Sequence, residues 1–194
     1  MSNATTTATI SGTSNRAQTG FEVDRTLTGT FQVKLWGRFH PGWLGALSSG
    51  LSRHRISIIS GSAKKTGTSW DASFEVTSTR FASDPLKLDF LALAREDNDA
   101  VAESVFSLSQ FTLEPPAKHH GALYLEVKAA DQLGFLGQLL NRLAFLLLFP
   151  EEISIDTVQG RIFDKFWIRG LGGTTPSETA QAALEKKLAE CRHA

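Results

Sequence analysis

The sequence predicts an α+β fold made of two similar units in tandem. In each unit, apolar residues that alternate with polar ones, as in strands, are interleaved with apolar residues at helical spacing. The order strand, helix, strand, strand, helix occurs twice along the chain. Equivalent residues also recur at one offset, since Gly42 and Gly134 lie 92 positions apart and so do Phe74 and Phe166. These observations predict two ferredoxin-like units of the βαββαβ order, the second of which lacks its own fourth strand.

The second unit, residues 121–194, has the clearer pattern. A strand leads into a glycine-containing turn, and leucines at helical spacing then predict a helix that Pro150 stops. A capping box at residues 175–178 predicts the start of a second helix. The expected elements are a strand at 123–128, a turn at 131–134, a helix from 135, strands at 153–157 and 162–168, and a helix at 176–191.

The first unit, residues 29–115, repeats this order and adds a fourth strand. The expected elements are a strand at 30–39, a turn at 40–44, a helix at 44–51, strands between 56 and 76 around a turn at 64–68, a helix at 85–94 and a strand at 105–113. Pro115 and Pro116 then favour a stiff, extended joint between the two units.

Residues 1–28 are rich in small polar residues and are expected to form a tail, although residues 5–10 and 21–23 have local strand character. Because the second unit is predicted to lack a fourth strand, one edge of its sheet is expected to be open. Open edges pair readily with other strands. We therefore expect part of residues 1–28, or a partner chain, to pair with that edge.

Composition narrows the possible functions. Lys and Arg together number 20, as do Asp and Glu, so the formal net charge is zero and no phosphate-binding surface is predicted. The single cysteine, Cys191, excludes an intramolecular disulfide and fits a reducing compartment. No signal peptide is evident, and the longest apolar run, residues 143–149, is too short to span a bilayer. These features predict a soluble cytoplasmic protein that binds neither nucleic acid nor membranes.

Two turns are candidates for ligand binding. A strand that ends in a glycine-containing turn before a helix leaves free backbone amides beside the positive end of the helix dipole. Glycine lets a carboxylate approach these amides closely. The turns consist of His40, Pro41, Gly42, Trp43 and Leu44 in the first unit, and Asp131, Gln132, Leu133, Gly134, Phe135 and Leu136 in the second.

The second turn resembles that of ACT domains, small regulatory modules that bind amino acids. Residues 131–136 are similar to the Asp-x-Pro-Gly-x-Leu pattern of the family, with Leu133 where proline is usual. A second resemblance, closest to the last ACT domain of bacterial uridylyltransferases, is carried by Thr157, Gly160, Arg161, Asp164 and Phe166. The overall plan is similar to tandem-ACT regulators of the glycine cleavage system.

The resemblance implies that an amino-acid effector contacts both turns where two units meet, with no cofactor. Asp131 would hold the effector's ammonium group, or it would simply cap the following helix. The first unit departs from the family pattern, because Phe39 replaces the turn aspartate and Ala72 stands at the position equivalent to Asp164. The expected function is regulation linked to amino-acid binding. A homodimer is one arrangement in which the chain could act. The alternative is a regulatory protein-interaction scaffold without a ligand.

Other functions have weaker support. His119 and His120 could ligate a metal, but no cysteine or carboxylate cluster accompanies them, so a solvated linker is the expected interpretation. No nucleophile motif or pair of catalytic carboxylates is evident, and an enzyme is not expected. RNA binding on the sheet would need basic residues and an RNP sequence, neither of which the neutral chain offers.

Overall fold

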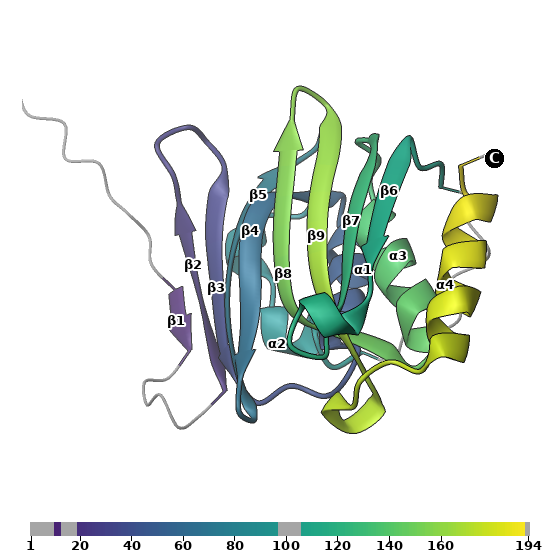
Figure 1. Cartoon of the computed structure of the whole chain (residues 1–194). Helices are drawn as coiled ribbons and strands as arrows, with labels where there is room; N and C mark the ends of the chain where they lie inside the picture. The colour runs from purple at the N-terminus through teal and green to yellow at the C-terminus, as the bar shows by residue number, and fades with distance from the viewer. Residues whose placement is uncertain (1–9, 13–18, 97–105, 193–194) are drawn as a thin grey trace, which may run out of the picture.

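The structure is a computed structural model, and it describes residues 10–12, 19–96 and 106–192. One antiparallel sheet of nine strands, in the order β1-β2-β3-β5-β4-β8-β9-β7-β6, forms one layer. Helices α1, α2 and α3 lie behind it in the view of Figure 1, and α4 lies beside β6. The α+β class predicted from the sequence is confirmed.

The strands and helices have the following bounds. The strands are β1 Ile10–Gly12, β2 Gly20–Arg25, β3 Phe31–Gly37, β4 Ile56–Thr66, β5 Ser69–Ser78, β6 Gln110–Glu114, β7 Leu123–Ala130, β8 Leu148–Val158 and β9 Arg161–Gly170. The helices are α1 Trp43–Arg53, α2 Phe90–Leu93, α3 Phe135–Phe145 and α4 Glu178–Glu190, with short 3-10 turns at Pro85–Lys87, Pro116–Lys118 and Leu171–Gly173.

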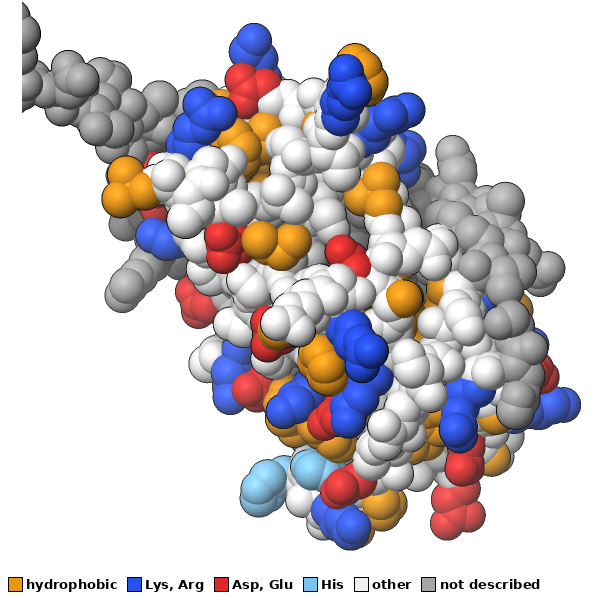
Figure 2. Space-filling view, turned by 90° about the horizontal axis from the view of Figure 1, so that it is seen from above, with side chains coloured by type: hydrophobic (Ala, Val, Ile, Leu, Met, Phe, Trp, Pro, Cys, Tyr) orange, Lys and Arg blue, Asp and Glu red, His pale blue; other side chains and the backbone are white. Residues whose placement is uncertain are grey.

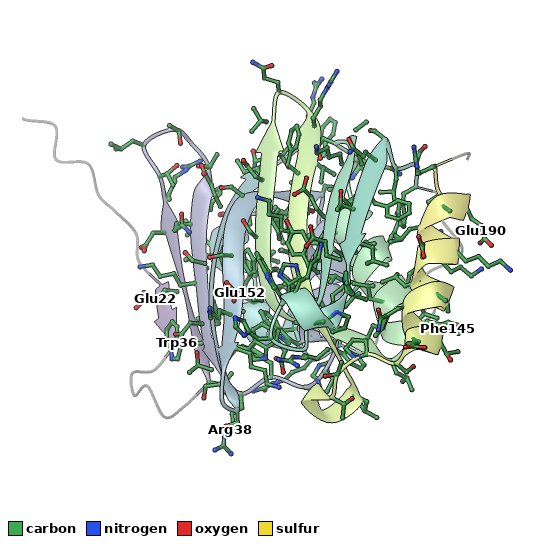
Figure 3. All side chains as sticks on the ribbon, viewed as in Figure 1. Glu22, Trp36, Arg38, Phe145, Glu152 and Glu190 are labelled. Atoms are coloured by element: carbon green, nitrogen blue, oxygen red, sulfur yellow. The ribbon has the colours of Figure 1, made fainter. Side chains whose placement is uncertain are left out.

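The two faces of the sheet differ because the strands alternate apolar and polar side chains. Val33 and Leu35 of β3, like Leu125 and Val127 of β7, are buried toward the helices and join one continuous core. The opposite face carries polar side chains and is not covered by α1, α2 or α3, as Figure 3 shows around the labelled Glu152. The chain therefore forms a two-layer structure with one open sheet face.

The offset of 92 residues found in the sequence recurs in the structure. Helix α3 begins and ends 92 positions after α1, and the same holds for β8 after β4 and β9 after β5. Gly42 and Gly134 both have φ of 86°, and Arg55 and Leu147 have φ of 59° and 57°. The register shifts of β4 and β8 also lie 92 positions apart. The two halves therefore share the same backbone conformation over these elements.

The predicted place of the fourth strands was wrong. The strand expected at residues 105–113 to complete the first unit is β6, which pairs with β7 of the second half. The equivalent place beside β3 is taken by β2, from residues assigned to the tail. Sequence neighbours joined by short connections pair readily in antiparallel sheets, and each of these strands precedes its partner closely in the chain. Each half thus reads strand, strand, helix, strand, strand, helix.

Two consequences follow for the sequence predictions. The second half does not lack a fourth strand, since β6 supplies it, and residues 20–25 pair with β3 rather than with the second half. Pro150 does not end a helix either, because α3 ends at Phe145 and Pro150 lies inside β8 beside its bulge. Proline is tolerated at a bulge, where a ladder hydrogen bond is already missing. The expected helix at 85–94 is a short 3-10 turn followed by the four-residue α2.

The two halves join through β4 and β8, which pair in register around Ser62 and Ser154. These two serines are themselves 92 positions apart, so exchanging the two halves leaves the pairing unchanged. The two halves are therefore related by an approximate twofold axis between Ser62 and Ser154. On the helix side α1 packs against α3, where a Cβ added to Gly137 would lie 2.8 Å from Ser49 Oγ. Small residues therefore allow the two helices to approach closely.

Candidate functional site

A small cavity lies at the junction of the two halves, between the sheet and the helices. Its volume is about 30 Å³. The first half contributes residues of α1 and β4, and the second half contributes the turn after β7, the start of α3, and parts of β8 and β9. The lining residues are Ser48, Leu51, Ile56, Ser57, Ile58, Asp131, Gln132, Gly134, Phe135, Leu136, Gly137, Ile155, Thr157, Ile162 and Asp164.

The start of α3 forms one wall of this cavity. Gly134 is its N-cap residue, in the left-handed conformation, and no side chain caps the helix. Asp131 is exposed, and within the described residues its side chain makes no hydrogen bond to the helix. The interpretation of Asp131 as a helix cap is therefore not supported. The Phe135 N–H donates to the carbonyl oxygen of Gln132, so this side of the cavity offers a ligand the helix dipole and the N–H groups of Leu136 and Gly137.

Asp164 is the buried charged group of the site. It lies on the helix-facing side of β9 and is only 1% exposed. Its nearest neighbours on the same face of the strand, Ile162 and Phe166, are apolar. Its Oδ1 accepts one hydrogen bond, 3.3 Å long, from the backbone N–H of Asp156. Burial raises the pKa of Asp164 to about 7, with smaller contributions from the negative charges of Asp156 and Asp131, and the Asp156 N–H acts in the opposite direction.

Ser48 brings a second buried polar group to the cavity, from the opposite half. It lies on α1 and is 6% exposed, and its Oγ has no hydrogen-bond partner in the structure. Buried hydroxyls nearly always have a partner, because leaving one unpaired costs about 1–3 kcal/mol. An unpaired Oγ in a cavity wall can form a hydrogen bond with a water molecule or a ligand that enters the cavity.

The equivalent place around the first turn is filled by aromatic side chains. Phe39 stacks on Trp43 with ring centroids 4.5 Å apart, and Trp43 meets Trp70 edge-on at 5.4 Å. Trp43 and Trp70 are buried. His40 Nε2 is 2.8 Å from the carbonyl oxygen of Ala94. The two turns are therefore equivalent in backbone and different in chemistry.

The sequence-predicted site residues divide accordingly. Five of the second turn line the junction cavity, while Leu133 is 38% exposed and is not part of its lining. The first-turn residues His40, Pro41, Gly42, Trp43 and Leu44 do not line this cavity. Sequence reasoning missed Ser48 and Ser57. The repeat offers one signal for Ser48, since the residue 92 positions later is the apolar Leu140.

A wider trough of about 860 Å³ lies on the open face of the sheet, over β2, β3 and β5. Glu22 and Trp36, both labelled in Figure 3, line it. Lys34 and Glu22 form an exposed ion pair there, with Nζ and Oε2 3.8 Å apart. Because these groups are solvated and already paired, the trough has weaker features of a ligand site than the junction cavity has.

The side chain of His119, in the joint, has partners within the protein. His119 Nε2 is 2.9 Å from Glu114 Oε2, and its ring stacks on Tyr124 at 4.9 Å. The hydrogen bond from His119 is the main cause of a lowered pKa of Glu114. Within the described ranges, no group of three or more His, Cys, Asp and Glu side chains could hold a metal ion.

The outer surface gives further limits. Figure 2 views the end of the molecule at which the β8–β9 turn projects, and acidic and basic side chains are both scattered over this end. A patch of one sign, as a nucleic-acid surface would need, is not visible there. Across the part of the chain that is described, no helix combines the length and the apolarity needed to cross a membrane.

Comparisons with known proteins leave the family open. No protein-family model matches the sequence, and no curated protein matches it. The class of the protein must therefore be inferred from its repeat, its fold and the junction cavity.

Proposed function

We propose that this chain is a cytoplasmic regulatory protein made of two ACT-like, ferredoxin-like units, and that it binds an amino acid or a similar small metabolite at their junction. The strand order β2-β3-β5-β4 in the first half and β6-β7-β9-β8 in the second supports this class. The last strand of each list lies at the junction, where β4 pairs with β8, so the halves lie side by side in one sheet. The resemblance of residues 131–136 to the ACT turn adds support.

The observation that carries the proposal is the junction cavity with its two under-bonded groups. Asp164 comes from the second half and Ser48 from the first, so one ligand would contact both halves at once. A ligand that contacts both halves stabilises the arrangement in which they are close, and it shifts the population toward that arrangement. The protein would then regulate through a partner that binds only this arrangement of the two halves. The function involves no catalysis.

A thermal-shift screen against the common amino acids tests this proposal. Ligand at about 100 times its Kd raises stability by about 2.7 kcal/mol, which corresponds to a melting-temperature rise of roughly 5–10 °C for a chain of this size. The Asp131→Ala and Asp164→Asn variants should lose the response, whereas Asp71→Asn, on the exposed side of β5, should keep it. A flat screen with folded protein would contradict amino-acid binding.

A second function, a protein-interaction scaffold without a ligand, is favoured by the size of the cavity. About 30 Å³ is less than a whole amino acid occupies, so full enclosure of an effector would require the walls to separate. A scaffold of this kind would show a flat amino-acid screen together with a defined oligomer or complex. Size-exclusion chromatography coupled to light scattering, with and without amino acids, separates the two functions, because only the effector function predicts a ligand-dependent change.

A further inference from the structure

We propose that the junction cavity is a site for an ammonium group, held between the Asp164 carboxylate and Ser48 Oγ, with the rest of the ligand outside the cavity. This inference rests on the proposed function for the ligand class, and it adds which end of the ligand is buried. Four features of the molecule support it: the size of the cavity, its hydrogen-bonding groups, the charges around it, and the difference between the two halves.

Size comes first. The cavity volume of about 30 Å³ suits a group of one or two heavy atoms. One water molecule takes up about 30 Å³ in the liquid, and an ammonium group is close to water in size. The cavity as it stands therefore accepts the end of a ligand rather than the whole molecule. Asp131 and Gln132, which are exposed residues of the lining, mark the side on which the remainder would reach solvent.

The hydrogen-bonding groups of the cavity require a donor. Asp164 receives a single bond of 3.3 Å although a carboxylate has two oxygens with several acceptor sites, and Ser48 Oγ receives none. An ammonium group carries three donors and no acceptor, so it satisfies both. A ligand carboxylate would be repelled by the Asp164 charge and would have only the N–H groups of the first turn of α3 and the Ser48 hydroxyl as donors.

The charges around the cavity favour a cation. Asp131 follows β7 and Asp156 lies on β8, and both contribute negative charge at Asp164. None of these three aspartates takes part in an ion pair with a described Lys, Arg or His side chain. The first half adds only neutral groups to the cavity lining, namely Ser48, Ser57 and apolar side chains of α1 and β4. A cation therefore gains from the charges of these three aspartates, and the positive end of the α3 dipole acts in the opposite direction.

The first half lacks both groups at the equivalent positions. The residue equivalent to Asp164 is Ala72, and the residue of the second half equivalent to Ser48 is Leu140. Trp43 is buried beside Trp70 at the corresponding turn. The polar pair thus occurs at one of the two otherwise matching places, which predicts one ammonium site per chain.

The test uses two small probes that separate the ends of an amino acid. Full-length ¹⁵N-labelled protein is titrated with methylammonium chloride and with sodium acetate at pH 8, at matched ionic strength. We expect methylammonium to shift the amide signals of Ser48, Thr157 and Asp164 in a saturable way, and acetate to leave them unchanged. Asp164→Asn should weaken methylammonium binding by roughly 10- to 100-fold. Ser48→Ala should weaken it by less, since a charged hydrogen bond is stronger than a neutral one.

Controls and failures are distinguishable. Asp71→Asn, an exposed carboxylate on β5, should bind methylammonium as the parent does, and circular dichroism confirms that each variant is folded. Acetate shifts at these amides, or no methylammonium response, would overturn the ammonium site even if an amino acid binds in the screen. Saturable methylammonium binding that depends on Asp164 supports the site even if the screen contradicts an amino-acid effector. Because the pKa of Asp164 is about 7, protonation of its carboxylate should also make methylammonium binding about tenfold weaker at pH 6 than at pH 8.

Discussion

The buried carboxylate of Asp164 is the residue on which the account depends most. An ionised side chain in an apolar site is unfavourable, and the protein relieves this by raising the pKa of Asp164 to about 7. Near neutral pH the group is therefore poised between the two protonation states. A cation bound in the cavity would lower the pKa of Asp164, so that its proton is released to solvent and an ion pair forms.

The first prediction concerns stability and pH. The pKa of Asp164 is raised in the folded state relative to about 4 in the unfolded chain, so its stabilising contribution is complete below about pH 4 and is lost as pH rises through 7. The loss is about 1.4 kcal/mol per pH unit in that window. Asp164→Asn should remove this dependence, and should make the unliganded protein more stable than the parent at pH 8.

Urea unfolding of both proteins between pH 4 and 8 measures this difference. The parent's free energy of unfolding should fall relative to that of Asp164→Asn as pH rises. A constant difference between the two proteins across this range would show that Asp164 keeps an ordinary pKa.

The second prediction compares two glycines with the same backbone. Gly42 and Gly134 both have φ of 86°, where any side chain costs about 1–2 kcal/mol. A Cβ at Gly42 would meet nothing within 4 Å, whereas one at Gly134 would lie 2.9 Å from Ser52 Oγ of the other half. Ser52 Oγ is the end of a short side chain that can rotate, so Gly134→Ala should lower the free energy of unfolding only slightly more than Gly42→Ala does. A much larger loss for Gly134→Ala in chemical denaturation would show that Ser52 cannot move at the junction.

At the scale of elements, the strands that precede each repeat complete its sheet. Val23 of β2 is 1% exposed, and Phe21 meets Phe90 of α2 with ring centroids 5.6 Å apart. Strand β2 thus belongs to the core of the first half and is not a tail. The same place in the second half is taken by β6, whose Leu113 pairs with Leu125.

The third prediction follows from this pairing. Deleting residues 1–26 should lower the free energy of unfolding by at least about 3 kcal/mol, because buried apolar side chains and a strand ladder are lost. Deleting residues 1–18, which leaves β2 intact, is the matched control and should have a much smaller effect. Similar melting temperatures for the two truncations would show that β2 contributes little.

The periodic elements could be predicted from the sequence, and the strand pairing could not. Helices α1 and α3 and strands β3, β5, β7 and β9 each have a regular apolar pattern, so their position follows from local residues. The local pattern of residues 110–114 predicts a strand but does not show whether that strand pairs with the half before it or with the half after it. Asp131 and Gly134 could be predicted as site residues because the turn is local. Ser48 could not, because its role depends on how α1 meets the second half.

At the scale of the whole molecule, duplication has produced two equivalent places with different contents. One holds Asp164 and Ser48 around a cavity, and the other is packed with Trp43, Trp70 and Phe39. Aromatic side chains fill the first of these places, whereas the second keeps a cavity. This division suits a regulator that responds at one site.

The fourth prediction is the stoichiometry. Isothermal titration calorimetry with an amino acid that is positive in the thermal screen should give one site per chain, because Trp43 of the first turn is buried and packed against Phe39 and Trp70. The Asp164→Asn variant should abolish that site rather than halve the binding. Two sites per chain would show that the aromatic cluster opens and that the halves are functionally equivalent.

The most direct test of the central claim is a ¹⁵N–¹H NMR titration of the full chain with an equimolar mixture of the common amino acids. The claim that a ligand bridges the halves predicts saturable shifts at Ser48 and Ser57 of the first half together with Gly134, Gly137 and Thr157 of the second. Shifts confined to one half, or clustered at residues 40–44, would contradict it, and so would a spectrum that does not change.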